Sequence, residues 1–113
     1  MEGILYHYRA RVTGVWDGDS ITCEVDLGFK FCRKEMKLRL YGINTPEIRG
    51  HEREIGLLAR NALRKKILGK EVIIQTKKDT TGKYGRYLAT VFFEGENINQ
   101  WLLDNKFAEK YMC

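Results

Sequence analysis

Residues 36–47 read MKLRLYGINTPE. In the first half of this stretch, every second side chain is apolar: Met36, Leu38 and Leu40. The side chains between them, Lys37, Arg39 and Tyr41, carry charge or a hydroxyl. This period of two predicts a β-strand with one buried face. Gly42, Pro46 and Gly50 interrupt the pattern, so we expect the strand, which begins near residue 30, to end in a loop over residues 42–50.

Four other segments show the signals of β-strands, and the chain also holds two helical patterns. The five predicted strands are residues 6–14, 21–27, 30–41, 72–74 and 87–93. Their inward faces include Tyr8, Ala10 and Val12 in the first strand, and Ile21, Cys23, Val25 and Leu27 in the second. Short turns join the first three strands, as in an antiparallel meander.

The predicted helix over residues 52–68 has apolar side chains at helical spacing. We expect Ile55, Leu58, Ala59, Ala62, Leu63 and Ile67 to face the core. Gly69 is a typical helix stop. Further on, Asn97 and Gln100 have the spacing of a capping box, so a short helix is expected there, with Ile98, Trp101 and Leu102 inward.

The order of these elements is three strands, a helix, two strands and a short helix. This is the layout of the OB-fold, a five-stranded α+β barrel that often binds oligonucleotides. At 113 residues the chain is expected to form one domain, residues 1–113.

Composition favours a folded domain with a polyanionic partner. Twenty Lys and Arg against fifteen Asp and Glu give a net charge of +5, which suits DNA or RNA. The three cysteines lack the spacing of a zinc site. No signal-peptide or membrane-spanning stretch is seen, so we expect an intracellular protein with no membrane partner. We also expect a monomer.

Three clusters together supply the groups that phosphodiester cleavage needs. They are Asp17-Gly18-Asp19, Arg39 with Asn44-Thr45-Pro46-Glu47, and Lys83-Tyr84-Gly85-Arg86. Acidic and carbonyl oxygens bind a hard metal ion, a further carboxylate accepts the proton of a water, and two arginines neutralise phosphoryl charge. Each cluster alone is common, so the interpretation rests on their occurrence in one small basic domain.

These clusters and their order resemble those of the staphylococcal-nuclease-like (thermonuclease) family. The resemblance covers residues 9–111 and is most specific over residues 38–47. It implies an OB-fold barrel and calcium-dependent cleavage of DNA and RNA that leaves 3′-phosphates.

The resemblance also implies roles for individual residues. Asp19, Asn44 and the carbonyl of Thr45 match metal ligands, and the catalytic positions are Arg39, Glu47 and Arg86. Lys83 and Tyr84 match a pair beside the phosphate, and Tyr111 matches a tyrosine that packs on the base. The family usually has an aspartate where this chain has Asn44. Because an amide oxygen still ligates calcium but carries no charge, we expect weaker calcium binding or a preference for another divalent metal.

Each residue also has a structural interpretation. Asp19 can cap its own turn, Arg39 and Arg86 can be exposed strand arginines, and Glu47 can be an ordinary loop carboxylate. Two other functions therefore stay open. One is a catalytically inactive OB module that binds nucleic acid with basic and aromatic side chains. The other is a barrel that binds a protein.

Overall fold

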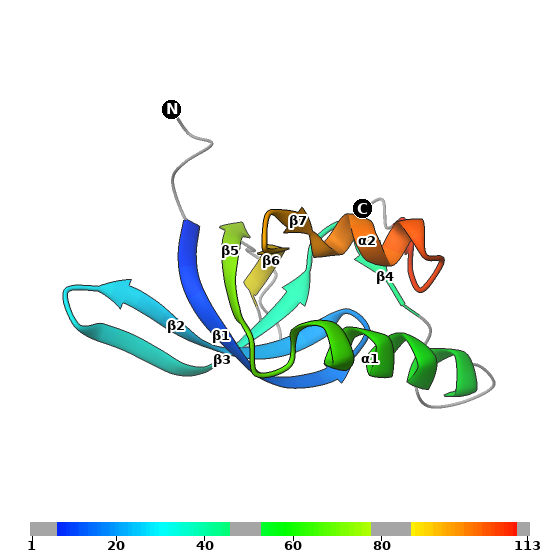
Figure 1. The fold of residues 1–113 in the computed structure, drawn as a ribbon, viewed down its shortest axis with the longest axis horizontal. Helices are drawn as coiled ribbons and strands as arrows, with labels where there is room; N and C mark the ends of the chain where they lie inside the picture. Colours follow the sequence, from blue (N-terminus) through cyan, green and yellow to red (C-terminus); the bar gives the residue numbers. More distant parts are fainter. Residues whose placement is uncertain (1–6, 46–52, 78–86, 111–113) are drawn as a thin grey trace.

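Five strands form a closed barrel in the computed structural model, which describes residues 7–45, 53–77 and 87–110 (Figure 1). The barrel strands are β1 (His7–Asp17), β2 (Ser20–Gly28), β3 (Phe31–Leu40), β5 (Glu71–Lys77) and β6 (Tyr87–Phe93). Antiparallel neighbours follow the order β3-β2-β1-β5-β6, and parallel pairing of β3 with β6 closes the ring. This topology confirms the predicted five-stranded OB-fold barrel.

Two helices and three short strands complete the described fold. Helix α1 (Arg53–Ile67) lies between the third and fourth barrel strands, and α2 (Ile98–Asp104) follows the barrel, as predicted. The short strands are β4 (Ile43–Asn44), β7 (Glu96–Asn97) and β8 (Glu109–Lys110). Strand β4 lies within the segment expected to be a loop. It pairs with β8, which joins the chain after β3 to the chain after α2.

The barrel core is built from the inward faces that the alternation predicted. Buried side chains come from every barrel strand and both helices: Ala10, Val12, Val15, Ile21, Cys23, Val25, Met36, Leu38, Leu40, Ile43, Leu63, Ile67, Val72, Ile74, Ala89, Val91, Ile98, Leu102 and Ala108. Full burial of one such aliphatic side chain contributes about 1.5–3 kcal/mol to folding. The core is therefore the main source of stability for the barrel rim, where the site lies.

The tip of the β2–β3 hairpin extends past the core. The prediction that Leu27 faces inward is wrong, because its side chain is 47% exposed. Strand pairing continues to Gly28 and Phe31 and so carries the hairpin beyond the residues that the barrel covers (Figure 1). Phe29 and Lys30 form the turn with positive φ angles of 54° and 66°. The alternation of apolar and polar residues in β2 does not show where the part of the protein that covers this strand ends.

Helix α1 is buried along only part of its predicted face. Ala59, Leu63 and Ile67 are fully buried, but Ile55 and Leu58 are 54% and 63% exposed, so their predicted inward placement is wrong. The first turns of α1 project beyond the barrel in Figure 1, whereas the last turns lie against it. Gly56, in these first turns, is nevertheless buried, so the buried stripe runs through Gly56, Ala59, Leu63 and Ile67, and Ile55 and Leu58 lie beside it. The 3.6-residue period thus identified the helix but did not place its buried face correctly at these two positions.

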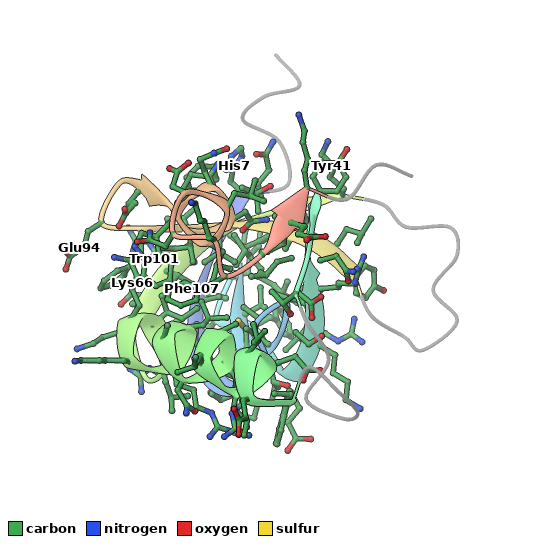
Figure 2. The ribbon with its side chains drawn as sticks, turned by 90° about the vertical axis from the view of Figure 1, so that its right-hand side faces the viewer. His7, Tyr41, Lys66, Glu94, Trp101 and Phe107 are labelled. Atoms are coloured by element: carbon green, nitrogen blue, oxygen red, sulfur yellow. The ribbon has the colours of Figure 1, made fainter. Side chains whose placement is uncertain are left out.

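Helix α2 is fixed at its start and against α1. The side chain of Asn97 accepts a hydrogen bond of 3.0 Å from the Gln100 amide, so the predicted N-cap is confirmed. Lys66 of α1 reaches across to α2 (Figure 2): its Nζ lies 4.6 Å from the Trp101 ring centroid and 2.9 Å from a carboxylate oxygen of Glu96. Within the described ranges, neither helix has the length and apolar run that crossing a membrane requires.

The core predicts contrasting reactivity for two cysteines. Cys23 is buried in β2, and desolvation raises the pKa of its thiol from 9.0 to about 12, whereas Cys32 is exposed. A raised pKa keeps Cys23 protonated through pH 8–9, so its reactive thiolate fraction should be about 1000-fold lower than at the ordinary pKa. We expect a thiol reagent at pH 8 to modify Cys32 rapidly and Cys23 only after unfolding in urea. Peptide mapping measures both rates, and equal rates in the native protein would contradict this burial.

Candidate active site

Asp19 lies in the tight turn between β1 and β2. Asp17 and Ser20 pair across this turn, which leaves Gly18 and Asp19 at its tip. The backbone carbonyl of Asp19 accepts a 2.8 Å hydrogen bond from the amide of Leu40, the last residue of β3. Asp19 is therefore held at the rim where β3 leaves the barrel, and it is only 8% exposed.

The Asp19 carboxylate connects this turn to the segment that follows β3. Its Oδ2 accepts a 3.2 Å hydrogen bond from the backbone amide of Thr45, 26 residues further along the chain. Its Oδ1 accepts a 3.3 Å hydrogen bond from the Ser20 hydroxyl. A carboxylate that accepts a buried backbone amide is a strong, charge-assisted contact. Asp19 thus fixes the start of the predicted catalytic loop.

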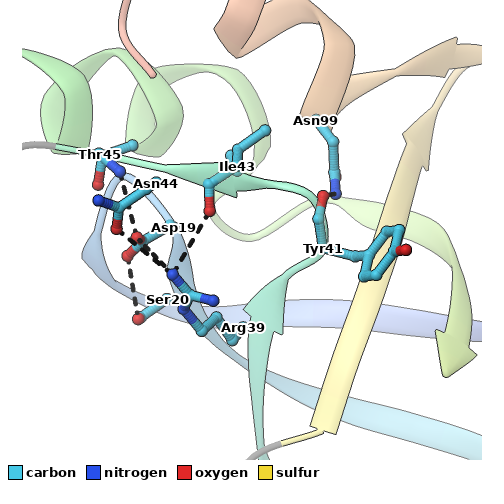
Figure 3. A network of polar contacts seen from close by, with 8 residues as sticks. All are labelled: Asp19, Ser20, Arg39, Tyr41, Ile43, Asn44, Thr45 and Asn99. Atoms are coloured by element: carbon cyan, nitrogen blue, oxygen red, sulfur yellow. Dashed lines mark hydrogen bonds and ion pairs between the residues drawn. The ribbon is translucent and has the colours of Figure 1, made fainter. Parts of the chain in front are cut away.

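Arg39 brings a guanidinium to the same place. Its backbone lies in the barrel wall, in register with Ser20 of β2 and Leu88 of β6. Its Nη2 lies 3.3 Å from Asn44 Oδ1, 3.5 Å from the Ile43 carbonyl oxygen and 3.9 Å from Asp19 Oδ2 (Figure 3). The fold therefore gathers four of the predicted site residues: Asp19, Arg39, Asn44 and Thr45.

The segment that carries Asn44 is held from two sides. In the β4–β8 ladder, Ile43 pairs with Lys110 and Asn44 with Glu109. Directly opposite residues of an antiparallel pair share a face, with Cβ atoms about 4.5–5.5 Å apart. Glu109 consequently brings a second carboxylate to the face of Asn44. Sequence reasoning missed Glu109, because nothing local indicates a pairing across 65 residues.

A buried asparagine fixes the end of β3. Asn99 of α2 donates hydrogen bonds to the carbonyl oxygens of Tyr41 (2.9 Å) and Ala89 (3.1 Å), and its own oxygen accepts one from the Val91 amide (3.1 Å). Figure 3 shows Asn99 directed at the Tyr41 backbone. Each buried backbone group left without a partner costs about 1–3 kcal/mol, so Asn99 stabilises the path of the chain into the site. Its only sequence signal was a polar residue beside the inward-facing Ile98.

The oxygen atoms around Arg39 suit a hard divalent cation. They are a carboxylate, a side-chain amide oxygen and a backbone carbonyl, which are the ligand types of calcium sites. Thr45 adds a buried hydroxyl that has no hydrogen-bond partner within the described parts of the chain. The described residues contain no group of three or more His, Cys, Asp and Glu side chains that would hold a metal. Any cation here would therefore depend on amide and carbonyl oxygens as well as on Asp19.

The remaining predicted site residues lie outside the described part of the chain. These are Glu47, Lys83, Tyr84, Arg86 and Tyr111. Their assignments, and those of the metal ligands, stay predictions. The described chain comes close to each of them in sequence, since Thr45 precedes the Pro46-Glu47 pair, Tyr87 follows Arg86 and Lys110 precedes Tyr111.

Polar and aromatic side chains continue from Arg39 along the outer face of the barrel. Lys37, Arg39 and Tyr41 alternate with the buried residues of β3, so they share its outer face. Lys77, at the end of β5, places its Nζ 4.0 Å from the centroid of the Tyr41 ring. Lys37 thus lies on one side of Arg39 along β3, and the pair formed by Lys77 and Tyr41 lies on the other.

The model of the family described as staphylococcal nuclease homologue matches residues 37–113, more than half of the chain. The chain belongs to this family. The match confirms the resemblance that the sequence motifs indicated. It includes Arg39, Asn44 and Thr45, whereas Asp19 precedes it. For Asp19, the link to the rest of the site is the hydrogen bond to Thr45.

A curated relative shares sequence over almost the whole chain. It is an uncharacterized protein of Methanocaldococcus jannaschii, 32% identical over 136 aligned residues that cover 94% of this chain and 60% of the relative. The chain therefore spans about three fifths of the length of this relative.

Gly18 predicts a steric limit at the site. A Cβ atom at this position would lie 2.8 Å from Thr45 Cγ2 and 2.9 Å from Ala59 Cβ, and the φ of Gly18 is not positive. Gly18→Ala should therefore destabilise the protein by crowding, by about 1–3 kcal/mol in urea unfolding. Thr45→Ser in the same chain removes the Cγ2 methyl and should recover part of the loss. Independent, additive effects in this double-mutant cycle would contradict the contact.

Proposed function

We propose that this protein is a metal-dependent phosphodiesterase that cleaves DNA or RNA, with calcium as the expected ion. The observation that carries the proposal is the arrangement around Arg39. A carboxylate, an amide oxygen and a backbone carbonyl lie within 4 Å of one guanidinium nitrogen, in a chain of the staphylococcal nuclease homologue family. Oxygen ligands and a phosphate-binding arginine are the elements of metal-assisted phosphoryl chemistry.

The proposed ion would be held by Asp19 Oδ2, Asn44 Oδ1 and an oxygen of Thr45. When bound, such an ion supplies charge neutralisation for the phosphate and lowers the pKa of a nearby water. Residues of the chain position the water, accept its proton and bind the phosphate. Glu47 orients the attacking water and accepts its proton, which is the role of its position in the family motif.

Two arginines complete the proposed mechanism. Arg39 and Arg86 donate hydrogen bonds to the phosphate oxygens and stabilise the negative charge that develops as phosphorus becomes five-coordinate. Planar guanidinium groups match phosphate oxygens with two parallel hydrogen bonds. One of the two arginines also assists the leaving oxygen.

The proposed substrate strand runs along the outer face of β3. Lys37 on one side of Arg39 and Lys77 on the other bind flanking phosphates, and Tyr41 offers a ring for base stacking. Lys83, Tyr84 and Tyr111 extend these contacts in the proposal. Because contacts to phosphate carry no base information, sequence preference should be slight and binding should weaken steeply with salt.

The nuclease proposal predicts calcium-dependent cleavage that requires Glu47. Labelled single-stranded DNA and RNA should be cut as calcium is titrated, EDTA should stop the reaction, and Glu47→Gln should lower turnover by about 100-fold or more while DNA binding persists. Glu94→Gln is the matched control, because Glu94 is exposed in a turn of the barrel away from the site (Figure 2).

Three results would contradict parts of this proposal. Unaltered turnover in Glu47→Gln would remove Glu47 from the mechanism. DNA binding without cleavage in calcium, magnesium and manganese would favour the inactive binding module, for which the neutral Asn44 is the specific supporting observation. Absence of salt-dependent binding to either nucleic acid would favour a protein-binding barrel.

Asn44→Asp should tighten calcium binding. At equal distance, the added negative charge attracts a divalent ion twice as strongly as it attracts the singly charged Arg39. The substitution should therefore favour binding of the ion over the contact with Arg39. We expect at least about a tenfold lower Kd by calorimetry, equivalent to ~1.4 kcal/mol. Asn61→Asp, on the exposed face of α1, is the control for charge alone. Glu109→Gln should weaken calcium binding, because it removes a negative charge from the face of Asn44. Unchanged or weaker binding in Asn44→Asp would remove this residue from the ligand set.

A further inference from the structure

A single guanidinium nitrogen lies at the centre of the oxygen cluster. Nη2 of Arg39 lies near the Asn44 amide oxygen, the Ile43 carbonyl and the Asp19 carboxylate, at 3.3, 3.5 and 3.9 Å. Figure 3 shows these contacts converging on one atom. Two of the three oxygens, those of Asp19 and Asn44, are also the ones proposed to bind the metal. The arginine therefore holds the position that a divalent cation would need.

We propose that Arg39 is the internal cation of this cluster and that a divalent ion binds by displacing its guanidinium. This inference rests on the proposed function, because the displaced group then turns toward the substrate phosphate. The metal and the arginine thus exchange partners: the ion takes the oxygens of Asp19 and Asn44, and the guanidinium takes the phosphate.

Charge makes simultaneous binding at these oxygens unfavourable. Asp19 contributes one negative charge, and Arg39 already balances it. A second cation within about 4 Å of the guanidinium would be repelled, and repulsion is strong where protein lowers the effective dielectric constant. An ion that binds here must therefore compete with Arg39.

The geometry allows the side chain to move while the backbone stays in place. The Arg39 backbone is paired with β2 and β6, so the proposed exchange needs a change in the side-chain torsions and no movement of the strand. Its contacts to the cluster, at 3.3–3.9 Å, are longer than the usual 2.7–2.9 Å of charge-assisted hydrogen bonds. Its side chain is 22% exposed, so solvent reaches part of it. The Asp19–Thr45 hydrogen bond holds the carboxylate during the exchange.

Exchange makes metal and phosphate binding cooperative. A phosphate that attracts Arg39 removes the competitor of the metal, and the metal in turn releases the guanidinium for the phosphate. Such coupling between two ligands is reciprocal and typically changes each affinity by 5–150-fold. Without metal, Arg39 stays neutralised by Asp19, so nucleic acid would bind this part of the surface weakly.

Calcium binding in the absence of nucleic acid tests the exchange directly. Isothermal calorimetry should show that Arg39→Met binds calcium at least about 5-fold more tightly than the unaltered chain, the lower end of typical coupling. Arg39→Lys, which keeps the charge, should bind calcium much as the unaltered chain does. Arg33→Met is the matched control: it removes the same charge from the same strand, but Arg33 contacts the Tyr87 ring at 5.7 Å rather than the oxygen cluster. Its Kd should change less than 2-fold.

The outcomes separate this inference from the proposed function. Calcium binding that is unchanged or weaker in Arg39→Met, with far-UV circular dichroism unchanged, would overturn the exchange and leave a metal-dependent nuclease intact. An equal gain in Arg33→Met would also overturn it, because general charge would then explain the effect. If neither the unaltered chain nor Arg39→Met binds calcium, magnesium or manganese, the metal-dependent function itself fails.

Discussion

The site depends on one hydrogen bond, from the Thr45 backbone amide to the Asp19 carboxylate. It joins the turn between β1 and β2 to the segment that follows β3, and both partners are buried. Without this backbone donor, the carboxylate, which is only 8% exposed, would lose a charge-assisted hydrogen bond, which is costly. Gly18 lets the turn approach Thr45 and Ala59 closely enough for this contact. Thr45, at the start of the loop expected over residues 42–50 of the family motif, is thus held by Asp19, which lies outside the residues that the family model matches.

The scaffold positions the site by closing the barrel at β3 and β6. Parallel pairing places Arg39 beside Leu88, two residues after the position of Arg86 in the chain. Asn99 then holds the end of β3 to β6 and α2, and β8 holds the strand that carries Asn44. The Asn99 contacts satisfy buried backbone groups that would otherwise have no partner. The rigidity of the site therefore comes from buried polar contacts as well as from the apolar core.

Asn44 gives this chain a different charge balance from that implied by its motif. One carboxylate, Asp19, faces one guanidinium, Arg39, and the neutral amide of Asn44 contacts the same guanidinium nitrogen. The β4–β8 ladder places Glu109 on the same face as Asn44, where its carboxylate can supply the negative charge that Asn44 lacks. In the proposed exchange, a weakly charged oxygen cluster with an internal cation makes metal and phosphate binding cooperative, because each ligand removes a contact that competes with the other.

The barrel, the order of the helices and the Asn97 cap could be predicted from the sequence, because strand alternation, helical period and turn residues act locally. It also grouped Arg39 with Asn44 and Thr45, which are close neighbours in the chain. The exposure of Leu27, Ile55 and Leu58 could not be predicted in this way, since local periodicity shows neither where a packing partner ends nor which side of a helix it covers. The same holds for Asp19, Asn99 and Glu109. Their contacts with the site span 26, 58 and 65 residues, and only the packing of the turn between β1 and β2, of helix α2 and of strand β8 around the barrel brings such distant segments together.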